Sequence, residues 1–435
     1  MFNLLSCRRG SAALATVAAL VPVIGVVALG GEAGSWYVTK QRAQNAADAA
    51  AYSAGLRLAC STSGSSNCDT AQDYVYRGKQ FAAQNAFCDA GISSYPGSNC
   101  ASLPTGTTQS VQIDQPTGSS VRAIVSQQQP TYLAAVLGLS TVNIRAQAVA
   151  QVQNPKDICI LGLGGVPSSS SALTIGGSSN ITGNGCGLMS NDTVKYASVA
   201  TFSGSGWAVD SVKGCVASAG HCDPGVPYNY NMLPATNPLK VLDTESFNSR
   251  TGTTQPCPPN GRVNNGETCS LSPSSTGAYR DLTVNAGGTL HLAAGTYFFY
   301  NAAIDFSGTV DNPDGLGVTL VLLGRSSLSI TGTVNLSAPT TNATYPDLSG
   351  VLIDDQAPNA SSNNVIVNGG GNVRLGGAMY FPNVDVSWGG TAANTNTTCS
   401  MVIANTITIT GNAYMSTNNC APGTIAHTQV VALVQ

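Results

Sequence analysis

The chain has 435 residues, of which only 9% are charged, and its formal net charge is −3. An average soluble domain carries about 25% charged residues, and nucleic-acid-binding domains gather Lys and Arg on one face. The composition therefore excludes nucleic acid as a partner on electrostatic grounds, and it is typical of exported proteins with many strands and turns.

The N-terminal stretch at residues 11–31 contains no charged side chain and is long enough to span a bilayer core as a helix. The sequence remains favourable for a helix beyond it, because residues 41–54 are rich in alanine and lack Gly and Pro. A cleaved signal peptide is the competing interpretation, since Arg8 and Arg9 supply a basic n-region. Against that interpretation, secretory apolar regions are usually only about 7–15 residues long.

A motif follows the apolar stretch, and it consists of Glu32-Ala33-Gly34, Tyr37, Lys40, Arg42 and Gln44-Asn45-Ala46-Ala47-Asp48-Ala49-Ala50-Ala51. With Ala19-Leu20-Val21-Pro22 before it, this pattern resembles the N-terminal module of the TadG-like proteins of Tad (Flp) pilus assembly. In that family A-L-x-P is followed by D-x-G-R-x-Y and L-Q-N-A-A-D-A-A-A-L-A. This chain departs from the pattern with Glu32 for Asp, Ser35 for Arg and Ala43 for Leu.

The resemblance implies a non-enzymatic, single-pass component of pilus assembly or adhesion in a bacterial inner membrane. Its partners would be other pilus-assembly proteins or pilins. The family-motif residues carried over are Glu32, Gly34, Tyr37, Gln44, Asn45 and Asp48. Many TadG relatives carry a metal-binding adhesion domain, but this chain has no D-x-S-x-S signature, so that activity is not carried over.

Cysteine positions indicate an oxidising compartment for most of the chain. Cys7 precedes the apolar stretch, and the other twelve cysteines follow it. Zinc is the competing explanation, with Cys215, His221 and Cys222 as its best ligands, but no C-x-x-C occurs and we predict no metal and no cofactor. Because short loops close at the lowest entropic cost, we predict disulfides between sequence neighbours. The predicted pairs are Cys60–Cys68, Cys88–Cys100, Cys159–Cys186, Cys215–Cys222, Cys257–Cys269 and Cys399–Cys420.

Residues 60–155 are predicted to form a small α/β module. Its expected elements are a helix from Asp69 to about Phe87, strands at 110–114 and 121–125, a short helix at 132–139 and a strand at 141–150. The complete domain prediction is a cytoplasmic tail at 1–10, a transmembrane helix at 11–31, a helical stalk at 32–59, the module at 60–155 and a β domain at 156–435. Residues after the anchor are expected in the periplasm or outside the cell.

Short alternating runs separated by Gly and Asn fill residues 156–435, and Ile-Thr-Gly occurs three times. Strands of three to five residues with such turns favour a right-handed parallel β-solenoid, because stacked coils bury the faces that single coils cannot. A β-sandwich or jelly roll is the alternative. Clustered prolines near 222–280 predict an inserted loop, which Cys257 and Cys269 would close.

Enzyme activity has little support in the solenoid sequence. The candidate acid–base residues are Asp305, Asp311, Asp314, Asp354 and Asp355, with Arg325 and Arg374. His221, His291 and His427 have no partner motif, and no nucleophile elbow, P-loop or H-E-x-x-H occurs. Trp207 and Trp388 either bind carbohydrate or cap the core. The alternative function is therefore a solenoid adhesin or a carbohydrate-binding or carbohydrate-active protein that recognises surface glycans.

Overall fold

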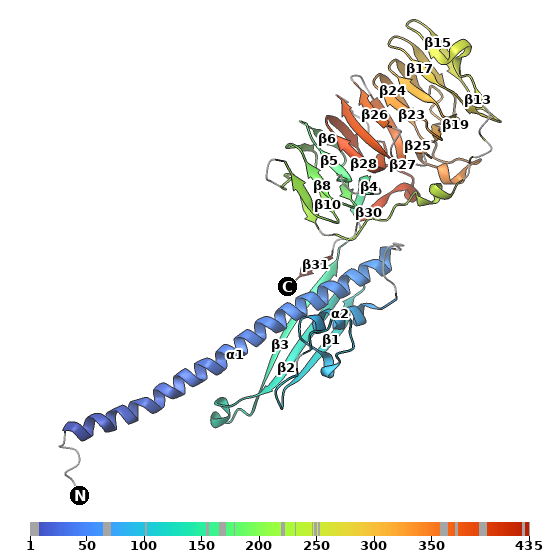
Figure 1. Cartoon of the computed structure of the whole chain (residues 1–435). Helices are drawn as coiled ribbons and strands as arrows, with labels where there is room; N and C mark the ends of the chain where they lie inside the picture. Colours follow the sequence, from blue (N-terminus) through green and yellow to red (C-terminus); the bar gives the residue numbers. More distant parts are fainter. Residues whose placement is uncertain are drawn as a thin grey trace. The chain divides into compact units, whose positions relative to one another are not determined.

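The computed structural model divides into two compact units. The helix–sheet unit comprises residues 1–153 and 431–435, and the solenoid unit comprises residues 154–430. Figure 1 shows the long helix α1 in the first unit and the stacked strands of the second. The structure describes residues 8–63, 71–100, 102–153, 156–164, 171–177, 179–218, 222–230, 232–245, 247, 250, 253–356, 364–369, 373–390, 398–428 and 431–434.

The helix–sheet unit begins with one continuous helix, α1 (Arg8–Ser63), which contains Pro22. A second helix, α2 (Tyr74–Gln84), follows Asp73, whose side chain accepts the backbone N–H of Tyr76 at 2.7 Å. This N-cap explains why α2 begins later than the sequence predicts. The predicted start, Asp69, lies outside the described residues.

An antiparallel sheet with strand order β1-β2-β3-β31 completes this unit. The strands are β1 (Thr108–Thr117), β2 (Ser120–Pro130), β3 (Thr141–Val152) and β31 (Val431–Val434). The predicted β domain at 156–435 is too long, because residues 431–434 pair with β3. In sequence, the solenoid unit is therefore inserted between two neighbouring strands of this sheet.

Two short 3₁₀ turns connect the elements of the unit, η1 (Asp89–Gly91) and η2 (Ala134–Leu137). The helix predicted at 132–139 is only the turn η2. It ends at Gly138, whose φ of 89° is left-handed and terminates helical geometry.

The stalk predicted at 32–59 is part of the core of the helix–sheet unit. Alanines without exposed surface line one face of α1 at spacings of three and four residues: Ala43, Ala46, Ala47, Ala50, Ala51 and Ala54. Small side chains allow a close approach. A Cβ added to Gly55 would lie 2.8 Å from Cγ1 of Val431 and 2.9 Å from Cβ of Ala150. The stalk and the module therefore share one core.

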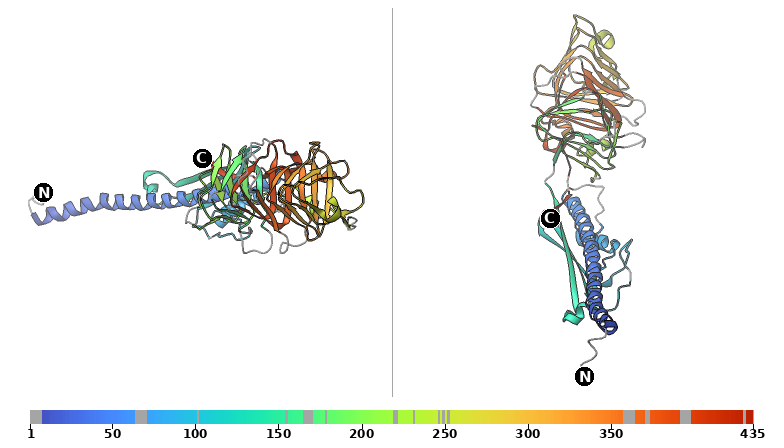
Figure 2. Two further views of the ribbon diagram at one scale, coloured as in Figure 1. Left: turned by 90° about the horizontal axis from the view of Figure 1, so that it is seen from above. Right: turned by 90° about the vertical axis from the view of Figure 1, so that its left-hand side faces the viewer.

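The solenoid unit is a parallel β-solenoid of about nine turns, as the short alternating runs predict (Figure 2). Its first arm, residues 156–230, contains β4 (Lys156–Gly162), β5 (Leu173–Ile175), β6 (Asn180–Gly183), β7 (Gly187–Ser190), β8 (Val194–Tyr196), β9 (Thr201–Ser203), β10 (Ala208–Ser211), β11 (Cys215–Ala217) and β12 (Tyr228–Tyr230).

The second arm, residues 253–415, is longer. It contains β13 (Thr253–Thr254), β14 (Arg262–Val263), β15 (Thr268–Leu271), β16 (Ala278–Tyr279), β17 (Leu282–Val284), β18 (Thr289–Leu292), β19 (Gly295–Tyr300), β20 (Ala303–Phe306), β21 (Thr309–Asp311), β22 (Val318–Leu323), β23 (Ser327–Ile330), β24 (Thr333–Ser337), β25 (Val351–Asp355), β26 (Asn364–Gly369), β27 (Val373–Gly390), β28 (Ser400–Ile409) and β29 (Asn412–Met415). The turns η4 (Cys257–Gly261), η5 (Pro346–Leu348) and η6 (Pro422–Thr424) and strand β30 (Ala426–Thr428) complete the unit.

The coils do not stack in sequence order. The first arm ends with β12, which pairs with β10. The second arm begins at the other end of the stack with β13, β14 and β15, and it coils back until β28 pairs with β4 and β5. Strand β30 is then antiparallel to β4. The chain thus enters and leaves this unit in the middle of the stack, at a seam between the two arms.

Rows of buried side chains run through the interior of both arms. One row consists of Val284, Phe306, Ile330, Val367, Trp388, Ile409, Ile175 and Tyr196. The step from Ile409 to Ile175 crosses the seam in unbroken parallel register. Two of the three Ile-Thr-Gly repeats supply Ile330 and Ile409 to this row, so the repeat in the sequence corresponds to equivalent positions in stacked coils.

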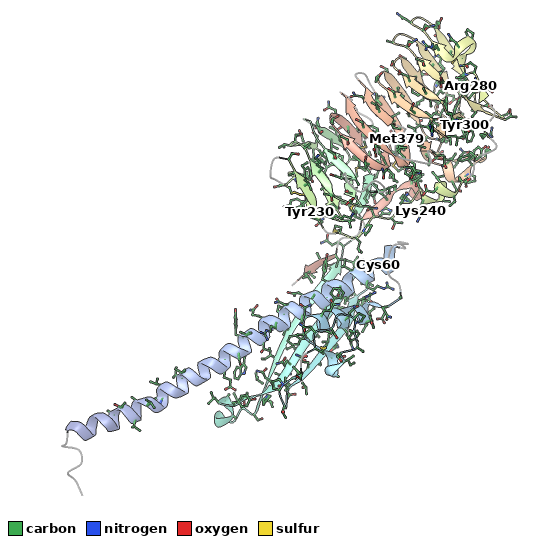
Figure 3. All side chains as sticks on the ribbon, in the orientation of Figure 1. Cys60, Tyr230, Lys240, Arg280, Tyr300 and Met379 are labelled. Carbon is green, nitrogen blue, oxygen red and sulfur yellow. A yellow bond between two sulfur atoms is a disulfide. The ribbon has the colours of Figure 1, made fainter. Side chains whose placement is uncertain are left out.

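A connecting segment, residues 232–250, takes the chain from the end of the first arm to the start of the second. It contains the turn η3 (Lys240–Thr244), and Figure 3 labels its Lys240. Leu242 and Phe247 of this segment are buried in a second apolar cluster with Tyr380. The segment therefore covers one outer face of the solenoid.

The loop insertion predicted near 222–280 is correct only for this connecting segment. Residues 228–230 form β12, and β13 and β14 pair in parallel with the next coil. The sequence pattern does not predict these very short strands, because proline is common at strand ends and turns and weakens the alternation.

Candidate membrane anchor and its attachment

The N-terminal half of α1 exposes large apolar side chains. Val17, Leu20, Val23, Val26 and Val27 are 52 to 71% exposed. Burying such a side chain is worth about 1.5–3 kcal/mol, so this face is unfavourable in water. The described part of α1 is long and apolar enough to cross a membrane, and none of its most apolar 18-residue window is buried. The feature fits a membrane anchor.

A carboxylate directly after the uncharged stretch attaches α1 to the β2–β3 connection. Glu32 accepts the backbone N–H groups of Tyr132 at 2.7 Å, Leu133 at 3.1 Å and Ala134 at 2.9 Å. These hydrogen bonds, chiefly the one from Tyr132, lower the pKa of Glu32 from its usual value because they favour the charged form.

Further polar contacts continue along the same face of α1 onto β3. Lys40 Nζ donates a hydrogen bond to the backbone carbonyl of Arg145. Gln44 Nε2 donates to the carbonyl of Gln147 at 3.2 Å and to Oδ1 of Asp48 at 2.9 Å. The side chains of Glu32, Lys40, Gln44 and Asp48 form the polar clasp, which fixes the register of α1 against the β2–β3 hairpin.

The other predicted motif residues face away from the sheet. Tyr37 is 66% exposed, Asn45 is exposed, and a Cβ added to Gly34 would meet nothing within 4 Å. The packing of the helix–sheet unit does not require these three residues. They are accessible to another molecule.

A family model described as putative Flp pilus-assembly TadE/G-like matches residues 10–59. Residues 10–59 are a TadE/G-like Flp pilus-assembly domain. Neither the comparison with curated proteins nor the comparison with solved structures finds a match. The TadE/G-like domain contains the exposed apolar half of α1, its buried alanine half and all six predicted motif residues. It supports a Tad-related role for the chain.

The Q-N-A-A-D-A-A-A run of the TadE/G-like domain has a packing role that sequence reasoning missed. Gln44 and Asp48 belong to the polar clasp, whereas Ala47 and Ala51 are fully buried. The spacing of the alanines, at positions three and four apart, is the signal that could have predicted a buried face.

Five disulfides join cysteines that are neighbours in sequence: Cys88–Cys100, Cys159–Cys186, Cys215–Cys222, Cys257–Cys269 and Cys399–Cys420. Cys60 is also disulfide-bonded. Its predicted partner Cys68 lies outside the described residues, as do Cys7 and His221. Two links lie in the outermost coils, Cys215–Cys222 in the first arm and Cys257–Cys269 in the second. Because an end coil has a neighbour on one side only, a cross-link there compensates for missing packing.

The candidate carboxylates of the solenoid make structural contacts. Asp311 Oδ1 lies 2.5 Å from Nδ1 of His291. Asp314 accepts backbone N–H groups from Leu316 and Ala294, both at 2.9 Å, which lowers its pKa. Ser307 donates to Asp305 at 2.7 Å. Within the described ranges, no group of three or more His, Cys, Asp or Glu side chains could hold a metal ion.

Asp354 and Asp355 are enclosed rather than facing a groove, with 0% and 1% exposure. Gln356 Nε2 donates to Asp354 at 2.8 Å and to the carbonyl of Leu242 at 3.0 Å, which ties the connecting segment to β25. Burial raises the pKa of Asp354 to about 7. Trp207 and Trp388 are 2% and 4% exposed and belong to the interior core.

Proposed function

We propose that the chain is a non-enzymatic, single-pass membrane component of Tad-type pilus assembly or adhesion, with the solenoid on the exported side of a bacterial inner membrane. One observation carries the proposal. Within the TadE/G-like domain, a single helix joins an exposed apolar segment to a segment packed in a folded core. No linker separates the two segments over residues 15–59, so the anchor holds the helix–sheet unit directly at the membrane.

The cysteines support export of the region after the anchor. Disulfides persist in oxidising compartments and are rare in the cytosol. Cysteine links occur in both units, and two of them close the ends of the solenoid. This distribution favours an orientation in which the short N-terminal tail is cytoplasmic.

The proposed partners are other pilus-assembly proteins or pilins. Gly34, Tyr37 and Asn45 offer them a contact surface on α1, because they belong to the family motif and the unit's own packing leaves them accessible. A groove of about 510 Å³ lies on the other side of α1, facing the sheet, and is lined by Gln44 and by Leu433 of β31.

Deleting the gene and imaging the cell surface tests this proposal. We expect fewer pili or weaker adhesion, and restoration of both by the intact chain. A chain with Tyr37→Ala and Asn45→Ala should remain folded and in the membrane but restore assembly less well. Normal pilus number and adhesion in the deletion strain would contradict the proposal.

A second candidate function, glycan binding, rests on a pocket of about 460 Å³ in the solenoid. Arg250, Thr296, Asn342 and Tyr345 line it, and the Arg250 guanidinium lies 4.7 Å from the ring centre of Phe298. Aromatic and hydrogen-bonding groups together are typical of ligand sites. Binding of the full chain to a glycan array, abolished by Tyr345→Ala and independent of pilus genes, would favour this function.

A further inference from the structure

The connection between β2 and β3, residues 131–140, exposes large apolar side chains. Tyr132 is 73% exposed, Leu133 41% and Leu139 56%. No charged residue occurs between Arg122 and Arg145, so the connection and both flanking strand ends are uncharged. Single exposed apolar residues are ordinary, but three on one uncharged connection form a patch that water does not favour. We call Tyr132, Leu133 and Leu139 the apolar tip.

The position of the apolar tip along α1 is fixed by Glu32. Its carboxylate accepts the backbone N–H groups of Tyr132, Leu133 and Ala134. Glu32 is also the first charged residue after the uncharged stretch at 11–31. Figure 2 shows the turn at 134–137 at the end of the sheet that faces the N-terminal half of α1. The tip therefore lies at the level where α1 leaves the proposed membrane span.

The opposite end of the same hairpin has the opposite character. The β1–β2 turn lies beyond the other end of β2, which is 11 residues long, or roughly 33 Å from the tip. Its Thr117 and Ser120 hydroxyls form a hydrogen bond at 2.7 Å, and Asp114 and Arg122 form an ion pair close by. The hairpin thus has exposed apolar side chains and no charged residue at the end beside the anchor, and it has an ion pair near the far end.

We propose that the apolar tip is a second membrane contact, which inserts into the boundary between headgroups and acyl chains of the leaflet from which α1 emerges. The inference rests on the proposed anchor, and the proposed tip contact would extend the anchor's contact with the membrane. Tyrosine is enriched at membrane interfaces, and apolar side chains bury there to a depth of about 5–10 Å. The two contacts, joined through Glu32, would fix the orientation of the helix–sheet unit on the bilayer.

Depth-dependent quenching of a fluorescent probe tests the proposal. The full chain with Cys7→Ser carries either Leu139→Cys or the control Ser119→Cys, each labelled with bimane without reduction of the disulfides. Each protein is reconstituted into vesicles of phosphatidylethanolamine and phosphatidylglycerol, with or without bromine-labelled acyl chains. Flotation of the vesicles reports anchoring separately. We expect both proteins to float, and we expect the probe at 139 to be quenched at least threefold more than the probe at 119.

A positioning role for Glu32 is tested in the same assay. Glu32→Ala removes the acceptor for three N–H groups, so quenching at position 139 should fall toward the value at 119 while flotation is unchanged. Glu32→Asp should restore part of the quenching.

Two outcomes would overturn the proposal and leave the anchor intact: floating protein with equal quenching at 139 and 119, or a probe at 139 that neither bromolipid nor aqueous iodide reaches, which would indicate a protein partner. Failure to float would overturn the anchor and the tip contact together.

Discussion

The two units fill their cores with side chains of opposite size. In the helix–sheet unit, α1 meets the sheet through alanines and Gly55, and the backbones approach closely. In the solenoid, Leu, Ile, Val and aromatic side chains fill the space between fixed coil positions in continuous rows. Interiors are close-packed in both cases. Added atoms should therefore damage the first unit, whereas removed atoms should damage the second.

The N-terminal half of α1 follows neither rule. It carries valine and leucine side chains of the kind that fill the solenoid interior, yet Val23, Val26 and Val27 contact no core and remain mostly exposed. One helix thus exposes valine and leucine side chains in its first half and buries alanines in its second half. The difference fits a helix whose first half is a membrane anchor and whose second half belongs to a protein core.

The largest expected effect comes from charges in that half. The double substitution Val23→Asp and Val27→Asp should abolish stable membrane association, because each charge near the centre of a span costs about 2.5–3.5 kcal/mol. Fractionation after alkaline extraction measures the result. The matched control, Tyr37→Asp with Gln41→Asp, has the same spacing on the exposed side of α1 beyond the span and should stay in the membrane pellet. Equal retention of the two variants in the membrane pellet would contradict the difference between the two halves of α1.

Removing atoms at the seam of the solenoid should be the next largest effect. Ile407 is buried and pairs with Leu173 of the first arm and Val386 of the second. Ile407→Ala should destabilise the solenoid by about 2–5 kcal/mol, because the cavity cannot close between stacked coils. Chemical denaturation followed by circular dichroism measures it. The neighbour Thr408, which is only half-buried, provides the control Thr408→Ala, and an equal loss for both would contradict the row-packed core.

The stability of the solenoid should fall with rising pH through Asp354. Its pKa is raised from 3.8 to about 7, so the folded state holds the proton more tightly than the unfolded chain does. The stability from this group is fully present below 3.8 and is lost as pH rises through about 7, a change of roughly 3 kcal/mol between about pH 5 and 8. Asp354→Asn should flatten the dependence and give a higher melting temperature than the wild-type chain at pH 8. An unchanged slope would show that Asp354 is ionised in the folded chain.

Adding atoms to the helix–sheet interface should have the smallest of these effects. Gly55→Leu should destabilise that unit by about 1–3 kcal/mol, because even its Cβ would lie 2.8 Å from Val431. Gly34→Leu is the matched control on the same helix, where a Cβ meets nothing within 4 Å, and it shares the gain in helix propensity. Thermal unfolding of the two variants compares them. A Gly55→Leu chain as stable as the control would show that α1 does not approach the sheet closely.

Local patterns predicted the elements better than their order. The short alternating runs in residues 156–435 predicted strands such as β5 and β28. They carry no information that these two strands stack on each other, because residues far apart in sequence meet at the seam. The alanine run predicted a helix correctly. The run did not reveal which sheet the helix packs against, since that sheet is complete only when residues 149–152 pair with residues 431–434. The motif of the candidate site was visible in the sequence, whereas the polar clasp required the position of the β2–β3 hairpin.

The mass and location of the mature protein test the central claim most directly. The chain is purified from cells after alkaline extraction of the membranes, and intact-mass analysis under non-reducing conditions identifies its N-terminus. An anchored component predicts a membrane-bound chain that retains residues 11–31. A soluble exported chain that begins beyond residue 31 would show that the stretch is a cleaved signal peptide, and it would contradict the account.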